Sequence, residues 1–163
     1  MNRYSLLLAP LALAACSQSV SEEEAAAETP QDTWWTALSS HCGNAYAGEL
    51  TSKDEADADM KGAEMVMHVR TCDEDRVTVP FHIKETGGEW NRSRTWVFTR
   101  TEDGLRLKHD HRHEDGTSDA VTMYGGDTAD AGTASTQSFP VDQESFDMFR
   151  REGLDVSVTN IWQ

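Results

Sequence analysis

The segment from Leu105 to His113 alternates between two kinds of side chain without a break. Because successive side chains of a β-strand point to opposite faces, residues two apart share a face. His109, His111 and His113 therefore continue the row that begins at Leu105. We expect this row to face the protein interior and the intervening charged residues to face solvent: Arg106, Lys108, Asp110 and Arg112.

Histidines two residues apart on a strand can share one metal ion. His109 and His113 would lie about 13 Å apart between Cα atoms, at ~3.3 Å per residue, so all three cannot easily bind the same ion. A divalent metal would use His109 and His111 and take further ligands from another strand, with His68, His82 or an acidic residue as donors. We expect no other cofactor. Two alternatives stay open, namely imidazoles bonded to neighbouring strands or water, and imidazoles that bind a small molecule.

A second alternating segment places Arg94, Trp96 and Phe98 on one face. If the two rings point inward, Arg94 does so too, and a buried arginine needs a carboxylate or the anion of a ligand. The alternative is an arginine at the rim, stacked on Trp96 with its guanidinium in water. The candidate ligand-binding residues are therefore Arg94, Trp96, His109, His111 and His113.

Signatures of common catalytic machinery are missing from the sequence. It contains no Gly-x-Ser-x-Gly elbow, no phosphate-binding loop and no His-Glu-x-x-His helix. We name no catalytic residue and favour a protein without enzymatic activity. The rival is a metal-assisted hydrolase or oxygenase built around His109 and His111.

The elements that must position these residues are mostly short strands. Period-two patterns predict strands over 45–51, 63–71, 76–84, 93–101, 105–113, 119–124, 133–139 and 156–162. A short helix capped by Asp32 or Thr33 precedes them and ends near Gly43, and a second helix with Asp142 as its N-cap precedes the last strand. About eight strands at this spacing favour a mainly β fold, an antiparallel up-and-down barrel, with a β-sandwich as the alternative.

A helix before the strands and another before the last strand resemble the layout of the lipocalin or calycin family. The region from Gly43 to Leu50 resembles the first-strand region of that family, but the family's Gly-x-Trp motif is absent. The resemblance therefore concerns architecture alone and implies a closed sheet. Residues 107–116 also resemble a segment of small secreted bacterial proteins that have no assigned activity.

The amino terminus resembles a targeting signal. Arg3 precedes an apolar run from Leu6 to Ala15, which is too short to cross a bilayer as a helix but suits a removable export signal. Leu13-Ala14-Ala15-Cys16 resembles the lipobox of bacterial lipoproteins. That resemblance implies removal of residues 1–15 as a signal peptide, acylation of Cys16 (diacylglycerol and palmitate), and, with Ser17 following, sorting to the outer membrane, with the domain facing the periplasm or the exterior.

Residues 16–33 combine high charge with few apolar side chains, which favours a flexible tether, and residues 34–163 form one β-rich domain. With Cys16 acylated, Cys42 and Cys72 are an even pair, and in an oxidising periplasm such a pair favours a disulfide. Two thiols as metal ligands is the alternative, which lacks the close Cys-x-x-Cys spacing of zinc sites.

The chain of 163 residues has a formal net charge of −15. An acidic surface repels phosphate backbones, so nucleic acid is excluded as a partner, and membrane attachment falls to the acyl chains. We expect a lipid-anchored extracytoplasmic binding protein of the bacterial envelope with a small polar and aromatic pocket. A metal-assisted enzyme using His109 and His111, or a purely structural envelope lipoprotein, is the alternative.

Overall fold

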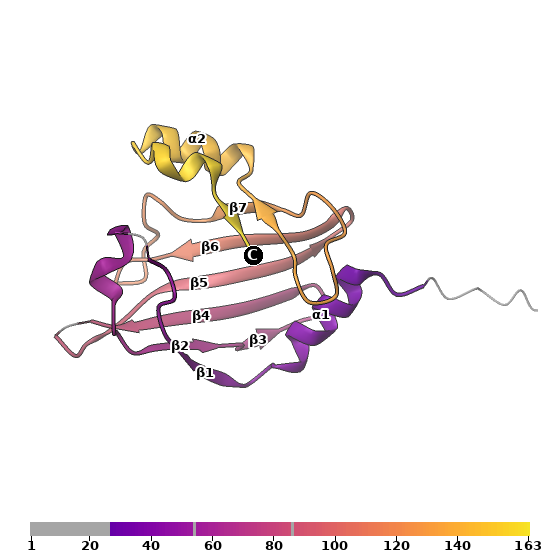
Figure 1. Ribbon diagram of the computed structural model, residues 1–163, viewed down its shortest axis with the longest axis horizontal. Helices are drawn as coiled ribbons and strands as arrows, with labels where there is room; N and C mark the ends of the chain where they lie inside the picture. The colour runs from indigo at the N-terminus through magenta and orange to yellow at the C-terminus, as the bar shows by residue number, and fades with distance from the viewer. Residues whose placement is uncertain (1–26, 54, 86) are drawn as a thin grey trace, which may run out of the picture.

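The computed structural model describes residues 27–53, 55–85 and 87–163. Its main layer is one antiparallel sheet of seven strands in the order β1-β2-β4-β5-β6-β7, with β3 also paired to β4 (Figure 1). The predicted mainly β fold is therefore confirmed. The strands are β1 (Ala45–Gly48), β2 (Met65–His68), β3 (Thr71–Cys72), β4 (Arg76–Lys84), β5 (Trp90–Thr101), β6 (Gly104–His111) and β7 (Tyr124–Asp127), and a small second sheet pairs β8 (Phe139–Pro140) with β9 (Ile161–Trp162).

The sheet stays open, so the predicted closed barrel is not confirmed. Strands β1 and β7 form its opposite edges in Figure 1. Three predicted strands that would complete a barrel are largely irregular: 119–124 contributes only its last residue to β7, 133–139 only its last to β8, and 156–162 only its last two to β9. The side chain of Gln137, for example, bonds to the backbone oxygens of Ala131 and Thr133, which holds that segment in a loop.

Helix α1 (Pro30–Ser40) begins earlier than the sequence predicts. Thr29 is its N-cap and forms a reciprocal capping box with Asp32, while Pro30 occupies the first turn. The expected cap at Asp32 or Thr33 is therefore wrong, because Asp32 serves as the acidic partner of the box. The helix starts inside the segment expected to be tether, 16–33, whose first residues lie outside the described part of the chain.

Helix α1 covers one end of one face of the sheet, and the main hydrophobic core lies there (Figure 1). Its ring contacts include Trp34 against Phe98 and against Phe139, with centroids 5.5 and 6.2 Å apart. A disulfide joins Cys42, just after the helix, to Cys72 in β3, which confirms the predicted pairing. The buried members of this core are Trp35, Val69, Val77, Val79, Leu105, Leu107 and Phe139.

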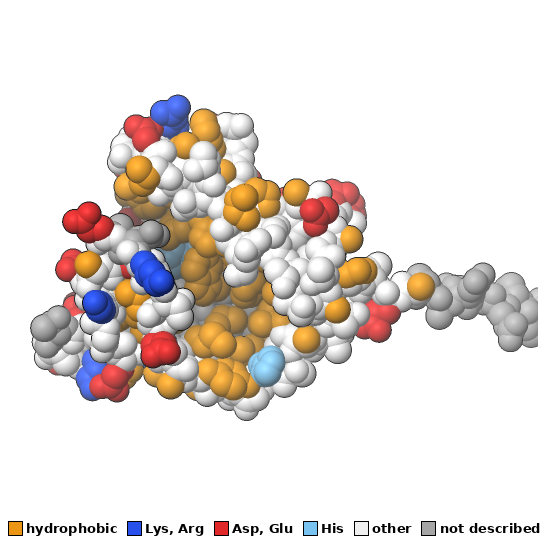
Figure 2. Space-filling view, in the orientation of Figure 1, with side chains coloured by type: hydrophobic (Ala, Val, Ile, Leu, Met, Phe, Trp, Pro, Cys, Tyr) orange, Lys and Arg blue, Asp and Glu red, His pale blue; other side chains and the backbone are white. Residues whose placement is uncertain are grey.

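The same face is hollowed farther along the strands. Figure 2 shows hydrophobic side chains on the floor of this hollow. Met67 on β2 is 42% exposed, and Phe81, its partner on β4, is half-buried. The 3₁₀ helix η1 (Glu55–Met60) stands at the other end of the sheet from α1 (Figure 1), so the covering layer is discontinuous.

Helix α2 (Gln143–Arg151) lies beyond the β7 edge in Figure 1 and is followed by the 3₁₀ helix η2 (Asp155–Thr159). Asp142 is its N-cap, as predicted, and accepts from the N–H of Ser145. Gly126 of β7 permits the close approach of the segment that leads into α2. Gly125 donates its N–H to the Ser145 hydroxyl, and a Cβ on Gly126 would stand 1.8 Å from the Pro140 carbonyl oxygen.

No helix in the described part of the chain is long and apolar enough to cross a membrane. Cys16 and the proposed signal peptide lie outside the described residues.

Candidate functional site

The β5–β6 hairpin brings four of the five candidate ligand-binding residues together. Its two strands pair Arg94 with His111 and Trp96 with His109. Because residues directly opposite in an antiparallel pair share a face, all four side chains emerge on the face that carries the core. Period-two alternation correctly predicts which residues of each strand share a face, and the register of the hairpin, which the sequence does not predict, brings the two rows together.

His109 is the most deeply buried member, with 4% of its surface exposed. Its ring stacks on Trp96 with centroids 4.4 Å apart, and its Nδ1 shares a hydrogen bond with the hydroxyl of Tyr124 on β7. Its Nε2 is buried without a hydrogen-bond partner among the described residues. Burial, with the nearby charges of His111 and Arg94, lowers the pKa of His109 from 6.5 to about 4. The ring is therefore neutral at neutral pH.

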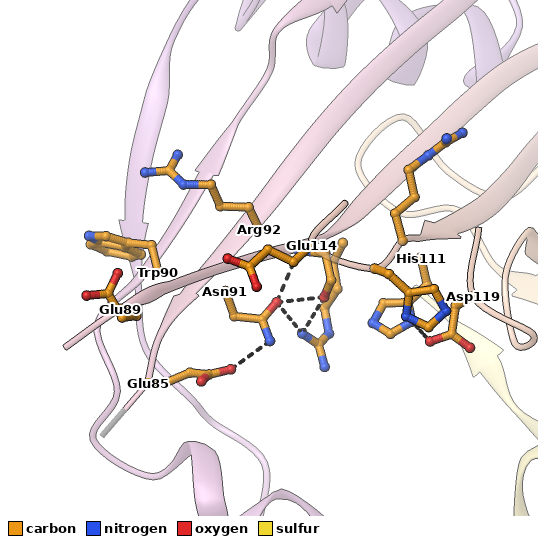
Figure 3. Close-up of a pocket in the computed structure, with 12 residues that line it drawn as sticks. Glu85, Glu89, Trp90, Asn91, Arg92, His111, Glu114 and Asp119 are labelled. Atoms are coloured by element: carbon orange, nitrogen blue, oxygen red, sulfur yellow. Dashed lines mark hydrogen bonds and ion pairs between the residues drawn. The ribbon is translucent and has the colours of Figure 1, made fainter. Parts of the chain in front are cut away.

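His111 is half-buried at the end of β6, and a carboxylate orients it. Its Nδ1 lies 3.0 Å from Oδ2 of Asp119, as the dashed line in Figure 3 marks. The N–H of Val121 bonds to the same carboxylate, and this bond together with the charge of His111 keeps the pKa of Asp119 below its usual value. The bond to Asp119 occupies Nδ1 of His111 and orients the ring.

His113 departs from the expected row because β6 ends at His111. The chain turns there: the His113 N–H donates to the carbonyl of Thr117, and the Gly116 N–H donates to the carbonyl of His113. The three imidazoles therefore go from buried at His109 through half-buried at His111 to exposed at His113. The period-two argument fails at the residue where the strand stops.

Lys108 overturns the expectation that the charged row faces solvent. Only 8% of its surface is exposed, because helix α2 packs at the β7 edge beside it. Its ammonium lies 2.6 Å from Oδ2 of Asp142 and 3.4 Å from Oε2 of Glu144. These two carboxylates compensate the buried charge. Asp110 is half-buried, whereas Arg106 and Arg112 are exposed as expected.

A cleft of about 720 Å³ opens beside the cluster, at the end of the sheet away from α1 (Figure 3). A second cavity of about 440 Å³ lies between this end and η1. Three residues line both: Glu85, Asn91 and Arg94. The remaining lining residues of the larger cleft are Glu89, Trp90, Arg92, Ser93, His111, Arg112, His113, Glu114 and Asp119, so Trp96 and His109 lie behind it.

Arg94 is half-buried at the junction of the two cavities. Its Nη1 donates to Oδ1 of Asn91 at 3.4 Å and to the Ser93 hydroxyl at 3.2 Å. No carboxylate of the described residues lies within ion-pair distance of it. Stacking of Arg94 on Trp96 is one of the two arrangements that the sequence allows for this side chain. In the structure the ring that stacks on Trp96 is that of His109.

Sequence reasoning missed Asn91 and Asp119. The Asn91 amide bridges two charged side chains: it donates to Oε1 of Glu85 at 2.7 Å and accepts from Arg94, and Figure 3 shows its contact to Glu85. The Asn-x-Ser spacing signals only a local bond from side chain to backbone, which here is the bond from the Ser93 N–H to Asn91 Oδ1. Asp119 begins the predicted strand 119–124, but this part of the chain is irregular, and an irregular bend brings the Asp119 carboxylate to His111.

A metal centre finds no support in the described residues. No group of three or more His, Cys, Asp or Glu side chains among them is arranged to hold an ion. Nδ1 of His109 is taken by Tyr124 and Nδ1 of His111 by Asp119. The metal site at His109 and His111 stays a prediction without a third ligand in this part of the chain.

Comparison with known proteins finds no family model, no curated protein and no solved structure that matches this chain.

Proposed function

We propose that this chain is a lipid-anchored binding protein of the bacterial envelope that holds a small molecule at the cleft end of its sheet. The observation that carries this proposal is the cleft of about 720 Å³ beside the predicted residues Arg94, His111 and His113. An aromatic wall accompanies these polar groups, since Trp90 also lines the cleft. A concave site with a few convergent polar groups is the usual form of a small-molecule site.

An open sheet suits this function as well as a closed barrel would. The covering layer formed by α1 stops short of the cleft end, so the face that would be the interior of a barrel is accessible from solvent there (Figure 2). The ligand would contact the half-buried rather than the fully buried part of the β5–β6 hairpin. Arg94, half-buried and without a carboxylate partner among the described residues, favours a binding role over a purely structural one.

The anchor rests on the sequence alone. Leu13-Ala14-Ala15-Cys16 supplies the acylation site, and the acidic composition leaves the acyl chains as the means of attachment. Labelled palmitate should be incorporated into the full chain and not into its Cys16→Ser variant. Equal labelling of the two proteins would contradict the anchor without touching the cleft.

The binding function is tested by NMR on the full chain purified in detergent. A panel of small molecules that contains anionic, neutral and cationic members is added to ¹⁵N-labelled protein. At least one compound should shift the amide signals of Arg94, His111 and Trp90 saturably. The amides of the β5–β6 turn, Glu102 and Asp103, provide the internal control because they lie at the other end of the hairpin. A panel without any compound that shifts the first group beyond the second would overturn the binding function.

A further inference from the structure

We propose that the ligand of this cleft is a monocarboxylate with a small apolar body, and that Arg94 binds its carboxylate. The inference deepens the proposed function and rests on it. It assigns a chemical class to the ligand, and it assigns to Arg94 the role of the anchoring cation.

Arg94 differs from every other cationic residue that the structure describes. Seven of them form ion pairs with Asp or Glu: Lys84, Arg100, Arg106, Lys108, Arg112, Arg150 and Arg151. Six of the described cationic residues form no such pair. Five of these are exposed to solvent, namely Lys53, Lys61, Arg70, Arg76 and Arg92, and the sixth is Arg94. Arg94 alone in the described part of the chain is both partly withdrawn from water and without a carboxylate.

The neighbours of Arg94 compensate its charge poorly. Its contacts to Asn91 and Ser93 are long, at 3.4 and 3.2 Å, and both acceptor oxygens are neutral. The same Asn91 oxygen also accepts from the Ser93 hydroxyl at 2.6 Å, so it is shared. A guanidinium forms its strongest hydrogen bonds with carboxylates and phosphates, as parallel pairs of N–H donors. An anion in the cavity would supply the missing partner.

The setting favours a single carboxylate over a dianion such as phosphate. Acidic side chains line both cavities, and a second negative charge on the ligand would be repelled by them: Asp59, Glu85, Glu89, Glu114 and Asp119. No helix N-terminus that could supply backbone donors to a phosphate is among the lining residues that the structure describes. Arg92 and Arg112 also line the larger cleft, but both are exposed to water, and Arg112 is paired with Asp110.

An apolar body fits next to the charged end. The second cavity, which Arg94 shares, is also lined by Met60, Ala63 and Ile83. On the sheet, Arg94 stands opposite Phe81, and Phe81 stands opposite the exposed Met67. Transfer of an apolar group from water onto this surface is favourable in proportion to the area that it covers.

The experiment compares matched acids and amides on the full chain in detergent. Phenylacetate and hexanoate are titrated beside phenylacetamide and hexanamide, which have the same apolar bodies without the charge. Inorganic phosphate serves as the dianion. The variants are Arg94→Gln, Arg94→Lys and the control Arg76→Gln, which removes an equal charge from an exposed arginine that lines neither cavity. Affinities are read from the Arg94 and His111 amide shifts.

We expect each acid to bind at least tenfold more tightly than its amide and than phosphate. Arg94→Gln should abolish that tenfold preference and leave amide affinity within twofold, Arg94→Lys should retain part of the preference, and Arg76→Gln should change neither. Equal affinity of acids and amides in the unmodified protein, or an undiminished preference in a folded Arg94→Gln variant, would overturn the carboxylate assignment. The binding function survives that outcome as long as any compound of the broad panel still occupies the cleft.

Discussion

The two ends of strands β4, β5 and β6 start from the same pattern and reach different outcomes. At the α1 end, the alternating side chains Val77, Phe98 and Leu105 lie under Trp34, Trp35 and Phe139. At the cleft end, the same face and the same alternation carry Phe81, Arg94 and His111, which are half-buried. The period-two pattern determines which side chains lie on this face. The segment that covers the face determines whether those side chains form core or a solvent-accessible site.

The difference in cover corresponds to a difference in chemistry. The strand positions that α1 and Phe139 cover are apolar, among them Val77, Leu105 and Leu107, because an unsatisfied polar group there would cost several kcal/mol, roughly 2–7 by transfer scales. Polar side chains appear where the cover ends, beginning with His109 at the boundary and continuing through His111 and Arg94. Stability and binding should therefore be separable by mutation along the strands.

The largest expected effect compares two phenylalanines. Phe139 is 2% exposed in the α1-end core, whereas Phe81 is half-buried at the open end. Truncation of a buried phenylalanine costs about 3–5 kcal/mol, because it leaves a cavity as well as removing buried area. Phe139→Ala should lower the free energy of unfolding by that amount in urea denaturation, and Phe81→Ala by less than about half of it. Equal losses would mean that the two ends are packed alike.

The disulfide should stabilise the fold without affecting the cleft. Cys42 and Cys72 close a loop with a sequence separation of 30 next to α1, so the chain-entropy estimate for the bond is about 3–4 kcal/mol. The double variant Cys42→Ala/Cys72→Ala should have a free energy of unfolding that is lower by this amount, and its urea midpoint should fall accordingly. Below that midpoint, its affinity for a cleft ligand should match that of the unmodified protein. A change in affinity in the folded variant would show that the two ends are coupled.

The sequence predicts which side chains share a face better than it predicts which strands pair. Alternation correctly groups Arg94 with Trp96 and His109 with His111, whereas the register that sets Arg94 opposite His111 has no signal in the sequence. Barrel closure fails because 133–139 and 156–162, which alternate as strands do, are held by side-chain bonds such as those of Gln137 or wound into η2. Alternation over a few residues does not tell whether a segment will find a partner strand.

Tertiary contacts determine the burial and the partners of the charged residues that the sequence pattern misplaces. Lys108 is buried because α2 supplies Asp142 across the β7 edge, where Gly126 allows the segment before the helix to approach. Asp32 is a partner in the capping box and pairs with Arg100, 68 residues away, rather than serving as the N-cap itself. Neither pairing has a periodic signature, since each joins segments that are distant in the chain.

His109, at the boundary between the two ends, should make stability depend on pH. Its pKa is about 4 in the folded protein, mainly through burial, against an ordinary value of 6.5. The unfolded chain therefore binds the proton more readily, and stability falls as the pH drops from 6.5 to 4. The full loss is about 3 kcal/mol, from 1.36 kcal/mol per pKa unit.

Urea denaturation across that pH range checks this expectation with a matched pair of variants. His109→Phe keeps a ring to stack on Trp96 but cannot be protonated, so its pH dependence should be flatter than that of the unmodified protein. Phe81→Leu removes no ionisable group and is the control, which should leave the slope unchanged. The same slope in His109→Phe as in the unmodified protein would assign the acid sensitivity to other groups.

The smallest expected effect is a gain in affinity at the cleft end. Glu85 lines both cavities and accepts from Asn91, so its negative charge acts on the carboxylate that Arg94 is proposed to bind. Glu85→Gln keeps an oxygen for Asn91 and removes the charge. Because exposed charges interact by roughly 0.5–1 kcal/mol, the affinity for phenylacetate should rise about two- to fivefold at low salt. Phenylacetamide should be unaffected. Glu102→Gln removes an equal charge from the hairpin turn at the α1 end and should change neither affinity measurably. Eight strand residues at ~3.3 Å each place it about 26 Å from Arg94, where a unit charge acts by only ~0.2 kcal/mol through water. A gain of the same size from Glu102→Gln would reduce the effect to overall net charge and remove the distinction between the two ends.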